Sequence, residues 1–144
     1  MSLSVFRDLT KSFCELTGLD DQSKMMDGGS IELNGVNFSF SYNPNINPAS
    51  FTIYCDFGQA PPDRKAEVYE ALLEANMYVH VGHFPAFMIF EPTKHVLFAT
   101  HRPLSMSAQE LCQLLIEIAE QARGWTQHYF QVAAASVAHK RVQQ

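Results

Sequence analysis

The sequence predicts an α+β fold in which helices accompany an antiparallel, twisted sheet. Three observations predict it: apolar residues at helical spacing near both ends of the chain, alternation of apolar and polar residues over 31–57, and two apolar runs, 84–90 and 95–100, joined by a short turn. The expected order is helix, three strands, helix, two strands, helix. With 144 residues the chain is long enough for one core and too short for two. We therefore expect one domain over 1–125 and a helical or flexible tail over 126–144.

The opening helix is expected over residues 5–16. Phe6, Leu9, Phe13 and Leu16 recur at the spacing of one helix face, and Gly18 follows as a stop signal. The polar stretch 20–29 ends in two glycines, which is typical of a turn. The chain is therefore expected to leave the helix through a loop before the first strand.

A meander of three strands is expected next, because the period changes to two after residue 29. Asn34 and Gly35 tolerate a positive φ, so this pair is suited to close a tight hairpin. The apolar faces of the second and third strands would be formed by Val36, Phe38, Phe40 and Tyr42, and by Phe51, Ile53, Cys55 and Phe57.

The runs 84–90 and 95–100 are apolar at almost every position, and Asp63 is placed to cap the helix before them, which ends near Met77. Strands that are apolar on both faces must be covered on both faces. Because the chain has few elements left for a second layer, we expect a second copy to cover them in a symmetric homodimer. The expected interface residues are Leu72, Leu73, Asn76, Phe87, Ile89 and Phe98.

A capping box predicts the start of the last helix, because Ser107 and Glu110 can each satisfy a free backbone N–H there. Gly124 is expected to interrupt this helix. Its buried stripe is predicted to consist of Leu111, Leu114, Leu115, Ile118 and Ala122.

Composition excludes several classes of protein. The chain is 47% hydrophobic and 17% charged, which is typical of a folded soluble domain. Its apolar runs fall far short of the ~20 residues that a membrane-spanning helix needs, and its first residues lack the build of a signal peptide. We expect no membrane insertion and a cytoplasmic location. The net charge of −5 makes nucleic acid an unfavourable partner.

The residues that carry chemistry form no recognisable constellation. His80 and His83 lie three residues apart and His95 and His101 follow, but no acidic or thiol residue stands at ligand spacing beside them. We expect no metal, no cofactor and no catalytic residue, since nucleophile and phosphate-loop motifs are missing as well. A small hydrolase or metal-binding enzyme is the less favoured alternative. Three cysteines are expected to be reduced core thiols, namely Cys14, Cys55 and Cys112.

The aromatic stripes allow two interpretations. They can be ordinary core, or part of this apolar surface can stay open as a groove, which on a soluble protein usually marks a partner site. Periodicity shows which face is apolar and not what covers it, so both interpretations stay open. The candidate partner-binding residues are Phe6, Phe13, Phe38, Phe40, Phe51 and Ile53.

The order of elements resembles that of the class I type III secretion chaperones, the Tir chaperone family. The pattern of apolar residues and elements is similar over residues 3–125. No family role can be carried over to the tail or to the loop 43–50. The segments that carry it are the opening helix 5–16, the strand pair around 29–38, Phe57-Gly58 with Pro61-Pro62, Leu72-Leu73-Glu74-Ala75-Asn76, and Val96-Leu97-Phe98 leading to Arg102-Pro103-Leu104.

The resemblance implies a function that the residues alone do not. Members of this family are small acidic cytoplasmic homodimers that bind effector proteins before secretion. The chain would then be a non-enzymatic chaperone that holds the N-terminal segment of an effector extended, with no need for ATP or metal. Such a segment can add a strand to a sheet edge while its side chains enter apolar pockets. A dimeric adaptor of the same fold without a link to secretion is the alternative.

Overall fold

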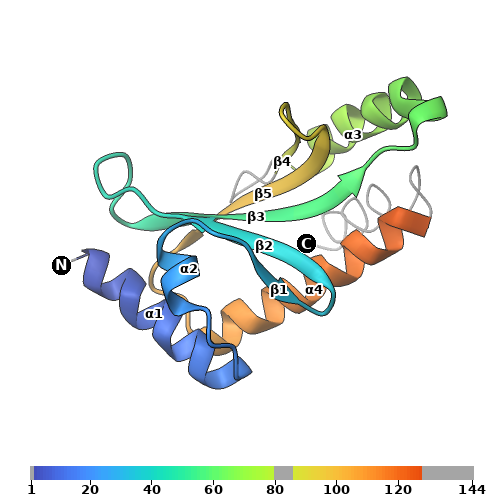
Figure 1. Ribbon diagram of the computed structural model, residues 1–144. Helices are drawn as coiled ribbons and strands as arrows, with labels where there is room; N and C mark the ends of the chain where they lie inside the picture. The colour runs from blue at the N-terminus through green and yellow to red at the C-terminus, as the bar shows by residue number, and fades with distance from the viewer. Residues whose placement is uncertain (1, 80–85, 128–144) are drawn as a thin grey trace.

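The computed structural model describes residues 2–79 and 86–127 (Figure 1). It confirms the predicted α+β class and the predicted order of elements, and it adds one short α-helix and one 3-10 turn. The elements are α1 (Ser2–Thr17), α2 (Gln22–Met26), β1 (Ile31–Leu33), β2 (Val36–Ser41), β3 (Ser50–Gln59), the 3-10 helix η1 (Pro62–Arg64), α3 (Lys65–Val79), β4 (Ala86–Phe90), β5 (His95–Pro103) and α4 (Ala108–Gln127).

The five strands form one antiparallel sheet in the order β1-β2-β3-β5-β4. Asn34 and Gly35 have φ of 53° and 79°, which confirms the predicted tight hairpin between β1 and β2. The pairing of β3 with β5 shifts register between Asp56 and Gly58. Gly58 supplies the positive φ, 86°, that this bulge uses. The hairpin of β4 and β5 therefore continues the sheet past a local bend.

One face of the sheet is covered by helices and the other is open. In Figure 1, α1 and α4 lie below the strands and meet there, while α3 lies at the far end beside β4. Side chains of β2 and β3 alternate between buried positions under these helices and less buried positions on the opposite face. In residues 2–79 and 86–127, no helix covers the middle of that opposite face, which we call the open face.

The core contains a cluster of aromatic rings centred on Phe57. The ring centroid of Phe57 lies 5.4 Å from that of Phe87, 6.0 Å from that of Phe98 and 5.7 Å from that of Trp125. These contacts connect β3 with β4, β5 and α4. The cluster therefore ties the outer hairpin of the sheet to the long C-terminal helix.

The capping box at the start of α4 is confirmed. The Ser107 N–H donates to Glu110 Oε1 at 2.9 Å, and the Glu110 N–H donates to Ser107 Oγ at 3.1 Å. Hydrogen bonds from Ser107 lower the pKa of the Glu110 carboxyl group. The carboxylate is therefore the form that the cap stabilises.

The ends of three helices differ from prediction. Leu16 is 49% exposed and does not belong to the buried stripe of α1. Asp63 does not cap α3, because Pro62 starts a 3-10 turn that runs directly into that helix. Gly124 does not interrupt α4, which continues to Gln127 because the fully buried Trp125 anchors its last turn. Packing of this kind outweighs the cost of a helical glycine, about 1 kcal/mol.

Further differences concern the boundaries of segments. The short helix α2 lies inside the stretch 20–29 that was expected to be a loop, and it contributes the buried Met25 to the core. Strand β5 is three residues longer than the apolar run 95–100. Residues 84 and 85 of the other expected strand, and residues 128–144 of the expected tail, lie outside the described residues. Within the part that the structure describes, no helix is both long enough and apolar enough to span a membrane.

Candidate protein-binding surfaces

The six apolar residues that the sequence suggested for partner binding are core residues. Each is at most 2% exposed, because four of them project from the sheet face that α1 and α4 cover, and the other two, Phe6 and Phe13, lie on the buried side of α1. The expectation that some of them would be partly exposed in an open groove is therefore wrong for the chain by itself. The residues concerned are Phe6, Phe13, Phe38, Phe40, Phe51 and Ile53.

The residues expected at a dimer interface fall into two groups. Leu73 is 71% exposed and Ile89 is 39% exposed, so these two side chains are free to meet another surface. Leu72, Phe87 and Phe98 are buried in the core of their own chain. Contact with a second copy stays a prediction, and the surface that can make it consists of the outer sides of α3 and β4.

Asn76 fixes α3 to the edge strand β4. The Phe87 N–H donates to Asn76 Oδ1 at 2.7 Å, and Asn76 Nδ2 donates to the Phe87 carbonyl oxygen at 3.2 Å. The amide thus pairs with the strand edge as another strand would. Because backbone groups of alternate residues face the same edge of a strand, Ile89 presents its N–H and C=O on this edge next to its exposed side chain.

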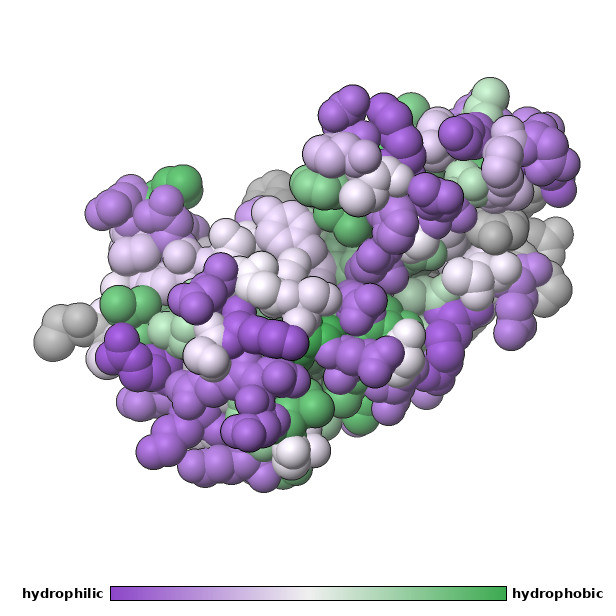
Figure 2. All heavy atoms as spheres, in the orientation of Figure 1, coloured by the Kyte–Doolittle hydropathy of each residue, from purple (hydrophilic) through white to green (hydrophobic). Residues whose placement is uncertain are grey.

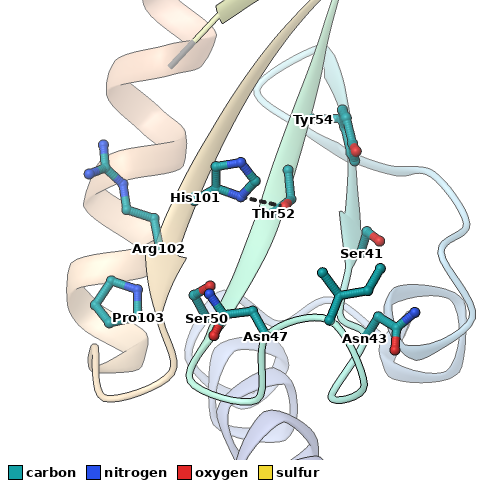
Figure 3. Close-up of a pocket in the computed structure, with 10 residues that line it drawn as sticks. Ser41, Asn43, Asn47, Ser50, Thr52, Tyr54, His101, Arg102 and Pro103 are labelled. Atoms are coloured by element: carbon teal, nitrogen blue, oxygen red, sulfur yellow. Dashed lines mark hydrogen bonds between the residues drawn. The ribbon is translucent and has the colours of Figure 1, made fainter. Parts of the chain in front are cut away.

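The first of two hollows on the open face is lined mostly by polar residues (Figure 3). Thr52 Oγ1 and His101 Nδ1 lie 2.8 Å apart in its middle. Arg102 points away from them, and its partial burial lowers the pKa of its guanidinium group. This hollow, the polar hollow, is lined by Ser41, Asn43, Ile46, Asn47, Ser50, Thr52, Tyr54, His101, Arg102 and Pro103.

The second hollow, the apolar hollow, lies on the same face toward β4. Its apolar wall is formed by Met88, which is 39% exposed, Phe90, which is 48% exposed, and the half-buried Leu97. Tyr54 lines both hollows, so they form one continuous surface across the sheet. The residues that line the apolar hollow are Gly28, Ser30, Asn37, Phe38, Ser39, Tyr54, Asp56, Met88, Phe90 and Leu97.

Hydrophobic surface gathers in the narrow middle of the molecule. Figure 2 shows it between the end that carries α1 and α2 and the end that carries α3, with polar residues on both sides. An exposed apolar patch with a polar rim is typical of a protein-binding surface. The open face is therefore a candidate site for an extended partner segment, and the edge of β4 is a candidate site for a second copy.

The side chains of Asp56 and His95 have a structural role. His95 Nδ1 lies 2.9 Å from both carboxylate oxygens of Asp56, and Asp56 Oδ1 accepts the Gly58 N–H at 2.7 Å, so this pair holds the bulge in β3. Among residues 2–79 and 86–127, no three His, Cys, Asp or Glu side chains lie together as metal ligands would. His80 and His83 lie outside the described residues.

The cysteines have the character of unreactive thiols where the structure buries them. Cys14 and Cys55 are buried, and this burial raises the pKa of both thiols, most strongly at Cys55. Cys112 is half-buried on α4. All three are free thiols in the structure.

Sequence reasoning missed Met88, Phe90 and Tyr54 as surface residues. A signal was available, because Ala86, Met88 and Phe90 share one face of an alternating strand and Phe87 lies on the other. The run was interpreted as apolar on both faces, and both faces were assigned to the dimer. The structure separates them, since Phe87 enters the core and Met88 and Phe90 line the apolar hollow.

The comparison with known families decides the kind of protein. The sequence profile of the Tir chaperone protein (CesT) family matches residues 31–126, about two thirds of the chain. The chain belongs to the Tir chaperone protein (CesT) family. No curated protein matches it. The resemblance that the sequence motifs suggested is confirmed, and membership makes this chain a type III secretion chaperone rather than a member of an enzyme family. The matched range contains the polar hollow, most of the apolar hollow and the edge of β4.

Proposed function

We propose that the protein is a cytoplasmic homodimer that binds the N-terminal segment of a secreted effector protein and keeps it extended and soluble. The observation that supports the effector site is the apolar hollow on the open face, with Met88 and Phe90 exposed beside it. Membership in a secretion chaperone family indicates the class of protein that would bind in this hollow, a secreted effector. The continuous surface formed by the two hollows suits a long, extended segment better than a small molecule.

The chemistry of the open face fits an unfolded segment. Apolar side chains of the effector would cover Met88, Phe90 and Leu97, and burying one large apolar side chain contributes roughly 1.5–3 kcal/mol. Ser39 and Thr52 farther along the same face offer hydroxyl groups to polar positions of the segment. A segment held in this way cannot use the same apolar side chains for its own collapse, so it stays ready for secretion.

The proposal is tested by capture of the partner. The tagged full chain is expressed in its native cell, and the proteins that co-purify are identified and treated with a protease. We expect a substrate of the type III secretion system whose N-terminal segment survives cleavage only while bound. Secretion of that substrate should fall when the chaperone is deleted. Recovery of non-secreted proteins alone would favour the adaptor of the same fold.

The dimer is predicted to use the outer sides of α3 and β4, where Leu73, Met77 and Ile89 are 71%, 72% and 39% exposed. Sedimentation should give twice the chain mass of 16.2 kDa at micromolar concentration. Ile89→Lys should weaken association roughly tenfold or more, because an unpaired charge would be buried. The control is Leu16→Lys, at a residue that is 49% exposed on α1, and it should leave the mass unchanged. A wild-type monomer at this concentration would contradict the proposed dimer.

A further inference from the structure

Strand β4 has the composition of a strand to which other strands add. It lies at the end of the sheet order β1-β2-β3-β5-β4, so one of its edges pairs with β5 and the other faces outward. Its sequence, Ala-Phe-Met-Ile-Phe, contains no charged residue and no proline. Met88, Ile89 and Phe90 are 39%, 39% and 48% exposed. An exposed apolar edge of this kind is a site for unwanted strand pairing unless the protein protects it.

The backbone groups on the outer edge of β4 belong to alternate residues. Phe87 is one of them, because its N–H and its carbonyl oxygen both bond to the side chain of Asn76 on α3. Ile89, two residues further along, is the other one within β4. Met88 lies between them and turns its backbone groups toward β5. A strand that added to this edge would need the groups of Phe87 and Ile89, and Asn76 already holds those of Phe87.

The Asn76 amide replaces a neighbouring strand without continuing one. A carboxamide carries a donor and an acceptor as a peptide group does, so it satisfies both backbone groups of Phe87, at 2.7 and 3.2 Å. The backbone of Asn76 belongs to α3, which lies beside β4 (Figure 1). Covering an edge with a helix is one of the ways in which proteins prevent strand addition.

We propose that Asn76 closes the outer edge of β4 to any added strand. A second copy then meets this edge through exposed side chains, namely Leu73, Met77 and Ile89, and does not extend the sheet. That part of the inference rests on the proposed function, whereas the closure of the edge does not. An unprotected edge would compete with the open face for extended apolar segments, since such segments bind readily by strand addition. Closure leaves the open face as the surface for an effector segment and the edge of β4 as the surface for a second copy.

Binding of a strand-forming peptide to the full chain tests the closure. The probe is a dye-labelled peptide with the sequence of residues 86–90 between lysines, and fluorescence anisotropy measures its affinity. Asn76→Ala removes both bonds to Phe87. We expect this variant to bind the probe at least about tenfold more tightly than the unchanged chain, because the backbone groups of Phe87 become available to an added strand. The matched control is Asn45→Ala, at an exposed loop residue, which should leave the affinity unchanged.

Two changes at Ile89 show whether the gain in affinity comes from strand pairing or from apolar surface. Ile89→Pro removes the outward N–H that an added strand needs, and proline is tolerated where the N–H of an edge strand faces outward. Combined with Asn76→Ala, it should abolish the gain. Ile89→Thr makes the side chain less apolar but keeps the N–H, so the gain should persist in that combination.

Two results would overturn the closure: an unchanged affinity in Asn76→Ala, or a gain that the two changes at Ile89 affect equally. Circular dichroism shows whether Asn76→Ala folds. If it does not fold, Asn76→Gln is measured in the same way, because its longer side chain moves the amide away from Phe87. The captured secretion substrate and the mass of the unchanged chain test the proposed function separately, so its failure would be distinguishable from failure of the closure.

Discussion

Phe57→Ala is expected to lower the free energy of unfolding by about 3–5 kcal/mol, the usual cost of truncating a buried phenylalanine. Phe57 is 2% exposed, and its ring contacts Phe87, Phe98 and Trp125. Truncation would therefore leave a cavity where β3, β4, β5 and α4 meet, and each of the three remaining rings would lose a neighbour. Urea unfolding followed by circular dichroism measures the effect. Chain concentration is held fixed, because dissociation of a dimer contributes to apparent stability.

The matched control for this substitution is Phe90→Ala. Phe90 is 48% exposed on the same hairpin, so the same chemical change should cost about 1 kcal/mol or less. Equal losses for the two variants would mean that the ring cluster around Phe57 does not hold the hairpin to the helix. A smaller loss at Phe57 than at Phe90 would contradict the assignment of core and surface altogether.

Local chemistry explains the features of the fold that the sequence predicted well. Asn34 and Gly35 select a tight hairpin because both accept a positive φ, whatever the rest of the chain does. Ser107 and Glu110 form a capping box because their own backbone and side chains complete it. Such features need only residues that are close in the sequence, so they can be read from it directly.

Features that depend on distant segments were predicted poorly. Nothing near Gly124 shows that Trp125 will pack against Phe57 and extend α4 through the glycine. The apolar periodicity of 36–57 identified a buried face correctly, but only the positions of α1 and α4 show that this face is closed. For that reason the candidate site lies on the open face of the sheet, and not on the helix-covered face that the sequence suggested.

Substitutions in the apolar hollow are expected to weaken partner binding without lowering stability. Met88→Ser combined with Phe90→Ser should weaken binding of the captured effector segment roughly 30-fold or more, since central interface side chains commonly contribute about 2 kcal/mol or more. Both side chains are solvated in the free chain, at 39% and 48% exposure, so they contribute much to association and little to folding. Titration calorimetry with the effector segment and a melting curve of each variant measure the two effects.

The contrast with a buried residue on β2 makes this result decisive. Phe38 lines the same hollow but is 1% exposed. The main expected effect of Phe38→Ser is therefore on folding: it should lower the free energy of unfolding by at least about 3 kcal/mol. Leu16→Ser, at a 49% exposed residue on α1 that lines neither hollow, is the surface control and should change neither quantity. If the double variant at Met88 and Phe90 binds the segment as tightly as the unchanged chain, the open face is not the effector site. The edge formed by α3 and β4 would then be the next candidate, because Leu73, Met77 and Ile89 are exposed there.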